Sequence, residues 1–123
     1  MKISIALAAY NGEKFLPDQL ASFASQTRLP DELIVTDDGS TDGTIPIIEA
    51  FAIAAPFPVR LEINKKNLGY AQNFSHAISL CTGDLVFLSD QDDVWMDKKI
   101  EYMTSLAEKN PEKACLINNT WLC

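Results

Sequence analysis

The strongest constraint on the fold is the alternation of two apolar patterns along the chain. Short apolar runs, typical of buried strands, are separated by stretches in which apolar residues recur every three or four positions, typical of helices. Repeated strand–helix–strand units favour an α/β fold with a Rossmann-like, mostly parallel sheet and helices on both faces. The expected strands are residues 2–8, 32–36, 59–63, 85–89 and 114–122, and the expected helices are residues 13–26, 44–55, 70–81 and 97–108.

Each expected helix has an apolar side that should face the sheet. The four predicted inward faces are Leu16, Leu20 and Phe23; Ile48, Phe51 and Ala52; Ala71, Phe74 and Ile78; and Ile100, Met103 and Ala107.

Composition narrows the class of protein. A chain of 123 residues is about one domain, taken here as residues 1–123. The net charge of −7 argues against nucleic acid as a partner, because binding it depends on Lys and Arg. No apolar run approaches the roughly 18 residues that a membrane span needs. Three widely spaced cysteines, Cys81, Cys115 and Cys123, fit neither a disulfide framework nor a metal site, which favours reduced thiols and a cytoplasmic location.

Polar residues follow three of the expected strands at their carboxyl ends. These loops are residues 8–11, residues 36–40 and residues 89–93. In open α/β sheets, ligands bind beyond the carboxyl ends of the strands. The sequence therefore predicts one acidic crevice at this edge.

The acidic cluster Asp90-Gln91-Asp92-Asp93 is a candidate metal site. Its carboxylates repel one another unless a cation lies among them, and hard oxygen ligands suit Mg²⁺ or Mn²⁺. Such a metal would offset the charge of a departing diphosphate. The alternative is a solvated loop in which Asp93 or Asp97 caps the next helix.

The other two loops carry candidate ligand-binding residues. Asp38 could accept a hydrogen bond from the N–H of a nucleobase, and the ring of Tyr10 could stack on one. The alternative is a turn closed by aspartate side chains, with exposed acids. Asn67, Gly69 and Asn73 could line the same crevice or mark the start of a helix, whereas a structural role is expected for His76, the only histidine.

Four stretches, taken together, resemble the family 2 glycosyltransferases, which have the GT-A fold. They are residues 3–11, residues 32–44, Asn67-Leu68-Gly69 with Asn73, and residues 83–95. The resemblance covers residues 1–97, and the form Ser-Asp-Gln-Asp-Asp-Val-Trp is most similar to branches of rhamnosyltransferases and other surface-polysaccharide enzymes.

The resemblance implies a role for individual residues in holding a nucleotide-sugar donor, a UDP- or dTDP-sugar. It implies that Ala8, Tyr10 and Asp38 hold the base and that Asp90 and Asp92 bind Mn²⁺ or Mg²⁺ as the paired acids of a DxD motif. The remaining nucleotide-binding residues that it implies are Asn11, Asn67, Gly69, Asn73, Asp90 and Gln91. The sequence departs from the family pattern at three positions: Ala8 replaces the usual Pro, Ala9 a Thr or Ser, and Gln72 an Arg.

The family's catalytic base lies in a later segment that also builds the acceptor site, and no residue of this chain matches it. We therefore expect residues 1–123 to be the donor-binding portion of a truncated GT-A domain, with the acceptor part absent and little activity alone. The implied enzyme is metal-dependent and inverting, and transfers a sugar to a glycan or lipid-linked acceptor. Peripheral association with the inner face of the plasma membrane, and a homodimer covering the edge of the last strand, are further expectations.

Two alternatives from other classes stay open. The first is a non-catalytic nucleotide-binding or interaction module that uses the same crevice. The second is a receiver-type signalling domain, which fits the length and the acidic α/β pattern. A receiver needs acids after the first strand and an acceptor aspartate after the third, where this sequence has Ala8-Ala9-Tyr10 and Asn64.

Overall fold

The computed structural model describes residues 1–89, 94–109, 115–117 and 120–122, and its centre is a six-stranded sheet in the order β3-β2-β1-β4-β5-β6. Neighbouring strands are parallel, except that β6 is antiparallel to β5. The strands are β1 Ile3–Ala9, β2 Glu32–Asp37, β3 Val59–Ile63, β4 Leu85–Ser89, β5 Cys115–Ile117 and β6 Thr120–Leu122. The prediction of one strand over residues 114–122 is wrong, since this segment forms two strands that pair with each other.

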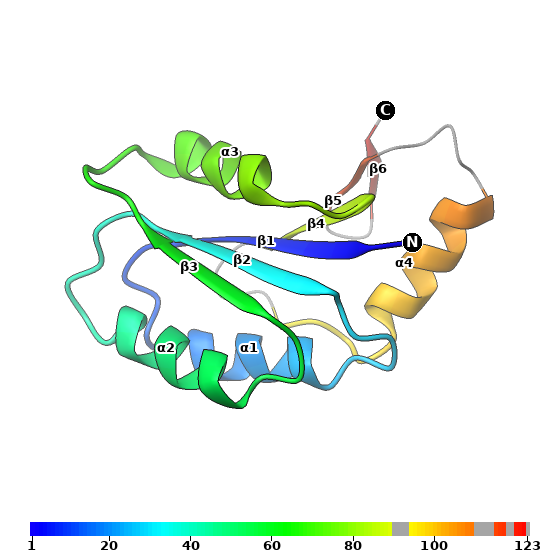
Figure 1. Ribbon diagram of the computed structural model, residues 1–123, viewed down its shortest axis with the longest axis horizontal. Coiled ribbons are helices and arrows are strands. Elements are labelled where there is room, and N and C mark those ends of the chain that lie inside the picture. Colours follow the sequence, from blue (N-terminus) through cyan, green and yellow to red (C-terminus); the bar gives the residue numbers. More distant parts are fainter. Residues whose placement is uncertain (90–93, 110–114, 118–119, 123) are drawn as a thin grey trace.

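Helices cover both faces of the sheet, which confirms the predicted α/β architecture. They are α1 Leu16–Ala24, α2 Thr44–Ala54, α3 Tyr70–Leu80 and α4 Lys99–Lys109. In Figure 1, α3 lies on one side of the sheet and α1 and α2 lie on the other. Gln26, just after α1, accepts a hydrogen bond from Ile100 N–H (3.0 Å) and donates one to Met96 O (2.7 Å), which joins α1 to the start of α4. No helix in the described ranges is both long and apolar enough to cross a membrane.

The hydrophobic core gathers side chains of β1, α1, α2 and α4. All seven residues of β1 are buried, because helices cover both of its sides. The predicted inward residues of α1 and α4 are buried, and Ile48 of α2 is buried with Phe51 packed against the core. The ring of Trp95 packs against Phe23 at 4.7 Å between centroids and against Phe87 at 5.7 Å.

The predicted inward face of α3 is wrong. Ala71 and Ile78 are exposed, whereas Asn73 and Ala77 are buried against the sheet. The helix is rotated because Asn73 donates hydrogen bonds to Thr36 O (3.1 Å) and Ala9 O (3.4 Å) at the ends of the strands. Apolar periodicity misses this, since the residue that anchors the helix is polar.

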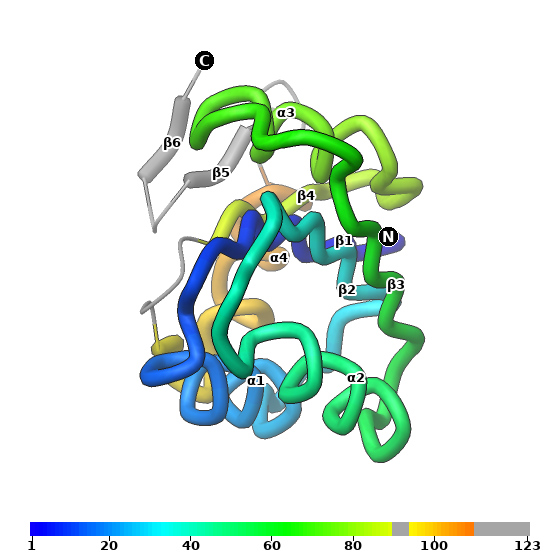
Figure 2. Tube along the Cα trace, turned by 90° about the vertical axis from the view of Figure 1, so that its left-hand side faces the viewer, coloured from blue at the N-terminus to red at the C-terminus, as the bar shows by residue number. Residues whose placement is uncertain are grey.

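The register aligns the carboxyl ends of the strands at one edge of the sheet. Ala9 lies opposite Asp37, Asp37 opposite Ile63, and Leu7 opposite Ser89. Figure 2 looks onto this edge, with α3 above the strands and α1 and α2 below them. The strand order also excludes the receiver-type alternative, because receiver domains have the order 2-1-3-4-5.

Candidate functional site

A pocket of about 300 Å³ lies at the carboxyl edge, between the ends of β1 and β2 and the start of α3. Six of the residues predicted from the sequence to bind a nucleotide come together in its wall: Ala8, Tyr10, Asp38, Asn67, Gly69 and Asn73. Ala9 and Tyr70 complete the lining. The pocket therefore brings together segments that are up to about sixty residues apart in the sequence.

Asp38 is the buried anionic group of this pocket, with only 4% of the residue exposed. Its Oδ1 accepts hydrogen bonds from Leu68 N–H (2.7 Å) and the Asn64 amide (3.0 Å), and its Oδ2 accepts one from Gly69 N–H (3.0 Å). Burial opposes ionisation, but these three donors outweigh it and hold the pKa of Asp38 below its ordinary value. The alternative of an exposed acid is therefore wrong for Asp38.

Asp37, the acid that precedes Asp38 at the end of β2, has different hydrogen-bond partners. Its carboxylate accepts hydrogen bonds from Gly39 N–H (3.0 Å), Ser40 N–H (2.8 Å) and the Ser40 hydroxyl (2.5 Å). Gly39 has a φ of 94°, which favours glycine. Asp37 therefore closes its own turn, as the structural alternative predicted, but it is buried rather than exposed.

Gly69 starts the segment that closes the pocket from the other side. Its φ of 86° is a conformation that glycine adopts without strain, and it directs the N–H of Gly69 to Asp38. Asn67 donates a hydrogen bond to the backbone oxygen of Asp38 (3.1 Å). The loop before α3 is thus fastened around Asp38, which makes this residue the organising centre of the pocket.

Two tyrosines lie at the pocket. Tyr10 and Tyr70 are 46% and 66% exposed, so each has ring surface open to a ligand. The ring of Tyr70 also packs edge-on against Phe74, with 5.3 Å between centroids. Tyr70 is not among the residues predicted from the sequence, although an aromatic residue directly after Gly69, at the start of a helix, was an available signal.

Asn64 and His76 form a second layer behind Asp38. Asn64 donates hydrogen bonds to Asp38 and to Asn73 Oδ1 (2.8 Å), and its own Oδ1 lies 2.9 Å from His76 Nδ1. His76 thus has the structural contact expected for it. Asn64, a polar residue directly after β3 at this edge, is not among the site residues predicted from the sequence.

Asn11 lies outside the lining of the pocket and joins two loops instead. Its N–H donates a hydrogen bond to the Ser40 hydroxyl (2.8 Å), and its Oδ1 accepts one from Thr41 N–H (2.8 Å). The loop after β1, which carries Tyr10, is thereby tied to the loop after β2, which carries Asp38.

The candidate metal and diphosphate residues Asp90, Gln91 and Asp92 lie outside the described residues, as does Asp93. Ser89, which precedes them, is buried and accepts a hydrogen bond from Gln19 of α1 (2.9 Å). Elsewhere, in the parts of the chain that the structure describes, no group of three or more His, Cys, Asp or Glu could hold a metal ion.

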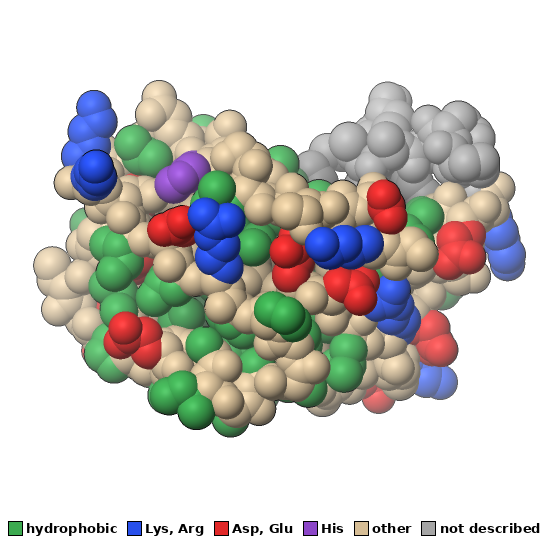
Figure 3. Space-filling view, in the orientation of Figure 1, with side chains coloured by type: hydrophobic (Ala, Val, Ile, Leu, Met, Phe, Trp, Pro, Cys, Tyr) green, Lys and Arg blue, Asp and Glu red, His purple; other side chains and the backbone are tan. Residues whose placement is uncertain are grey.

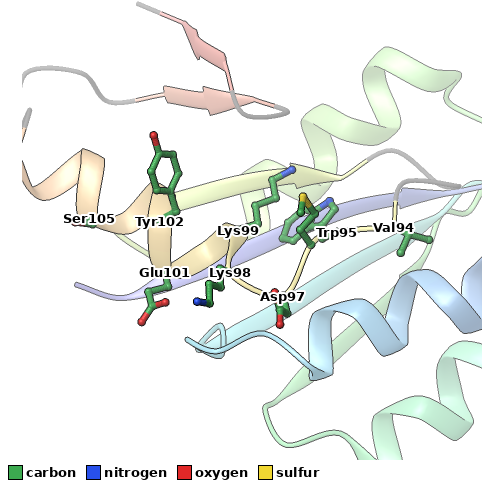
Figure 4. Close-up of a pocket in the computed structure, with 9 residues that line it drawn as sticks. Val94, Trp95, Asp97, Lys98, Lys99, Glu101, Tyr102 and Ser105 are labelled. Atoms are coloured by element: carbon green, nitrogen blue, oxygen red, sulfur yellow. The ribbon is translucent and has the colours of Figure 1, made fainter.

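A second cavity, of about 640 Å³, lies between the segment after residue 93 and the first turns of α4. Figure 4 shows Lys99 extending toward Trp95, and its Nζ lies 4.2 Å from the ring centroid. Val94, Met96 and Tyr102 are exposed apolar residues of its wall. It shares no lining residue with the pocket at Asp38, so the two cavities are separate.

The chain is similar in sequence and in structure to known proteins. A family model described as "Glycosyl transferase family 2" matches residues 4–120. The dTDP-rhamnosyl transferase RfbG of Shigella flexneri is 35% identical over 100 residues, covering 77% of this chain and 34% of that protein. The solved structure of S. aureus TarS 1–349 in complex with UDP is similar to this chain, with a TM-score of 0.81 and 26% sequence identity. The match covers 90% of this chain and 33% of that one.

A third protein was solved with a metal. The mannosyltransferase PcManGT from Pyrobaculum calidifontis, in complex with GDP-Man and Mn²⁺, has a TM-score of 0.70 and 26% identity, covering 76% of this chain and 28% of that one. This chain spans about a third of the length of the relatives that it matches.

Proposed function

The chain belongs to glycosyl transferase family 2 and has the α/β fold of GT-A glycosyltransferases, and we propose that it is the donor-binding portion of such an enzyme. The donor is a nucleotide-diphosphate sugar, with UDP or dTDP as the nucleotide. The observation that carries the proposal is the pocket in which Ala8, Tyr10, Asp38 and Gly69 meet around one buried carboxylate.

The pocket suits a nucleoside in shape and charge. The depressed pKa of Asp38 keeps its carboxylate ionised at neutral pH, so it can accept a hydrogen bond from the N–H of a base. The exposed part of Tyr10 offers a ring for stacking, and Ala8 forms a small apolar part of the wall. S. aureus TarS, solved with UDP and with UDP-GlcNAc, supports a nucleotide sugar as the class of donor.

The diphosphate and metal belong, in this proposal, on the β4 side of β1. The strand order reverses between β1 and β4, where open α/β sheets bind ligands. The acidic residues continue the chain directly from Ser89, so Asp90 and Asp92 would hold Mn²⁺ or Mg²⁺ through carboxylate oxygens, beside Gln91. A divalent cation there would offset the negative charge of the leaving diphosphate. The complex of PcManGT with GDP-Man and Mn²⁺ supports this choice of cofactor.

The remaining parts of the proposal concern the whole protein. We propose inverting transfer to a glycan or lipid-linked acceptor in surface-polysaccharide synthesis, with the catalytic base outside residues 1–123. The enzyme would be cytoplasmic, with peripheral contact to the inner face of the plasma membrane, and would assemble as a homodimer. NMR of the product's anomeric configuration, with the whole protein, tests the inverting step.

Thermal unfolding of the 123-residue chain tests donor binding. With Mn²⁺ and UDP or dTDP at about ten times its Kd, we expect the unfolding midpoint to rise by about 5 °C. An Asp92→Asn variant should lose the part of the shift that depends on Mn²⁺, because one carboxylate ligand is removed.

An Asp97→Asn variant is the control for the metal, because Asp97 is an exposed acid of the following segment. It should respond to Mn²⁺ as the unmodified chain does. No shift with any nucleotide and metal would contradict the proposed function. A nucleotide shift that Mn²⁺ leaves unchanged would contradict only the metal site.

A further inference from the structure

Strand β3 lies at the outer side of the sheet. It pairs with β2, and it is the last strand in the order β3-β2-β1-β4-β5-β6, so no described strand covers its other side. In Figure 1 it is the strand nearest the viewer, and in Figure 2 it lies at the right-hand side of the molecule. An open strand is a template for pairing with a strand of another chain. The outer side of β3 is therefore a candidate docking surface.

The hydrogen bonds to β2 show which backbone groups of β3 point outward. Just before the strand, Pro58 O accepts a hydrogen bond from Leu33 N–H (2.9 Å). Just after it, Asn64 N–H donates one to Asp37 O (2.8 Å). In a parallel pair the residues that bond to the neighbouring strand alternate, so the even-numbered residues of β3 face β2. The backbone N–H and C=O groups that point away from the sheet are those of Val59, Leu61 and Ile63.

The side chains of β3 alternate between the two faces of the sheet. Arg60 and Glu62 share one face as an ion pair, with 2.7 Å between Arg60 Nη2 and Glu62 Oε1. Val59 and Leu61 pack against the core on the other face. Ile63 shares this second face, but it is 53% exposed. One apolar residue thus stays open at the end of a face that is otherwise packed.

The sequence of β3, Val-Arg-Leu-Glu-Ile, is complementary to itself when two copies run antiparallel. With Leu61 opposite Leu61 of a second copy, Arg60 comes opposite Glu62, and Val59 comes opposite Ile63. The outward backbone groups of both strands then face one another as hydrogen-bonded pairs. The charged residues form the closer, non-hydrogen-bonded pairs, in which opposite charges are stabilising.

The charges also select this register. Charged side chains usually protect an open strand from pairing. A shift by two residues would place Arg60 opposite Arg60, or Glu62 opposite Glu62, and like charges directly opposite are destabilising. A shift by one residue would no longer align the outward backbone groups. The two charges of β3 therefore favour pairing centred on Leu61 and oppose the neighbouring registers.

Helix α2, which lies below β3 in Figures 1 and 2, has apolar residues on all of its sides. Its only charged residue is Glu49, and only Thr44 and Ile48 are buried, while Ile53 is 89% exposed. A helix that is apolar all round is typical of a buried position. A two-fold axis through Leu61, perpendicular to the sheet, would bring the α2 helices of both copies to the same face of the joined sheet. A second copy is thus an occupant that suits both β3 and α2.

We propose that two copies of this chain associate through their β3 strands, antiparallel and centred on Leu61, and form one continuous sheet. The inference rests on the homodimer of the proposed function and gives that homodimer a surface, at the opposite side of the sheet from β6. Among the described residues, those of β3 are absent from the lining of the pocket at Asp38. Association and nucleotide binding can therefore be measured separately.

Sedimentation velocity of the 123-residue chain, from about 5 to about 500 µM, tests the association. The unmodified chain should approach twice the mass of the monomer, with a Kd of about 100 µM or below, as a small interface can give. Arg60→Glu or Glu62→Arg alone places like charges opposite each other at two points, so each should weaken the dimer about 10-fold or more.

Two further samples test whether the charges face each other between copies. An equal mixture of the Arg60→Glu and Glu62→Arg chains should associate again, because the acids of one chain then face the bases of the other. The double variant Arg60→Glu/Glu62→Arg should dimerise like the unmodified chain for the same reason. Lys98→Glu is the control, since it reverses an exposed charge just before α4, and it should leave the association unchanged.

Three outcomes would overturn the inference: an unmodified chain that stays monomeric, a dimer that Arg60→Glu leaves as tight as before, and single variants whose mixture does not associate. Calorimetric titration with UDP and Mn²⁺ separates this result from the proposed donor binding. A monomer that binds UDP would overturn the dimer alone, whereas a dimer that binds no nucleotide would contradict donor binding alone. Should Arg60→Glu not fold, Glu62→Arg decides in its place.

Discussion

The two edges of the sheet each hold a carboxylate within a hydrogen-bond network, but Asp38 lines a pocket whereas the chain packs closely beside Glu32. At the carboxyl edge, Asp38 is held by the loop before α3. At the amino edge, Glu32 Oε2 accepts hydrogen bonds from the Ser4 hydroxyl (2.5 Å), Thr82 N–H (2.7 Å) and the Thr82 hydroxyl (3.1 Å). Burial opposes ionisation at both acids, and the donors outweigh it, so the pKa of each is lowered.

The packing around the two carboxylates explains the difference. A Cβ at Gly83 would lie 2.8 Å from Ser4 N and 2.9 Å from Lys2 O, so the chain is closely packed beside Glu32. A Cβ at Gly69 would meet nothing within 4 Å, because the pocket at Asp38 is open. The face in Figure 3 also mixes acidic and basic side chains, so charge alone does not mark the site. A held carboxylate therefore indicates a binding site only where space remains beside it.

The two edges should differ most when the carboxylate of each is removed, both in UDP affinity and in the free energy of unfolding. Asp38→Ala should weaken UDP binding about 10–100-fold and lower the free energy of unfolding by about 3 kcal/mol, because buried donors lose a charged acceptor. Glu32→Ala should lower the free energy of unfolding by about 1 kcal/mol and leave the affinity for UDP unchanged. Calorimetric titration and urea denaturation measure the two effects. Equal losses of UDP affinity in the two variants would break the comparison.

Substituting Gly69 at one edge and Gly83 at the other should give the next largest difference in UDP affinity. Gly69→Ala should cost about 1–2 kcal/mol of stability because of its positive φ, and should weaken UDP several-fold because its N–H is displaced from Asp38. Gly83→Ala should cost about 1–3 kcal/mol through overpacking against the backbone, with UDP affinity unchanged. Urea denaturation with UDP titration separates these outcomes, and a loss of UDP affinity in Gly83→Ala would contradict the assignment of that edge to structure.

The two edges should differ least in how pH changes the free energy of unfolding. Both acids have a pKa below their ordinary values of 3.8 for Asp38 and 4.5 for Glu32, so the unfolded chain binds more protons in acid. Their stabilising contribution is complete above those values and is lost as the pH falls through the lower pKa of the folded state. The free energy of unfolding should thus change little between about pH 7 and pH 5 through these groups and fall below about pH 4.5.

Two variants show which carboxylate causes this loss of stability in acid. Asp38→Asn and Glu32→Gln should each flatten the fall measured by urea denaturation between pH 3 and pH 7. A fall unchanged in both variants would mean that other acids cause it.

Much of the fold could be predicted from periodicity. The faces of α1 and α4 follow apolar spacing because both helices pack apolar residues against the core. The face of α3 does not, because Asn73 anchors that helix to strand ends by hydrogen bonds. The strand predicted over residues 114–122 is two strands, since a continuous polar and apolar pattern does not by itself mark a reversal of the chain.

For the site, the sequence by itself determined the residue types and the edge at which they gather. Parallel strands end together, so the loops after β1 and β2 had to meet. The family resemblance selected Asp38 over Asp37, but only the tertiary structure showed why they differ: the side-chain partners of Asp37 are its immediate neighbours, whereas those of Asp38 come from about thirty residues away. Tyr70 and Asn64 joined the site in the same way, through the docking of α3. Hydrogen bonds between neighbouring residues can be predicted from the local sequence, whereas contacts between distant segments form only once the chain has packed.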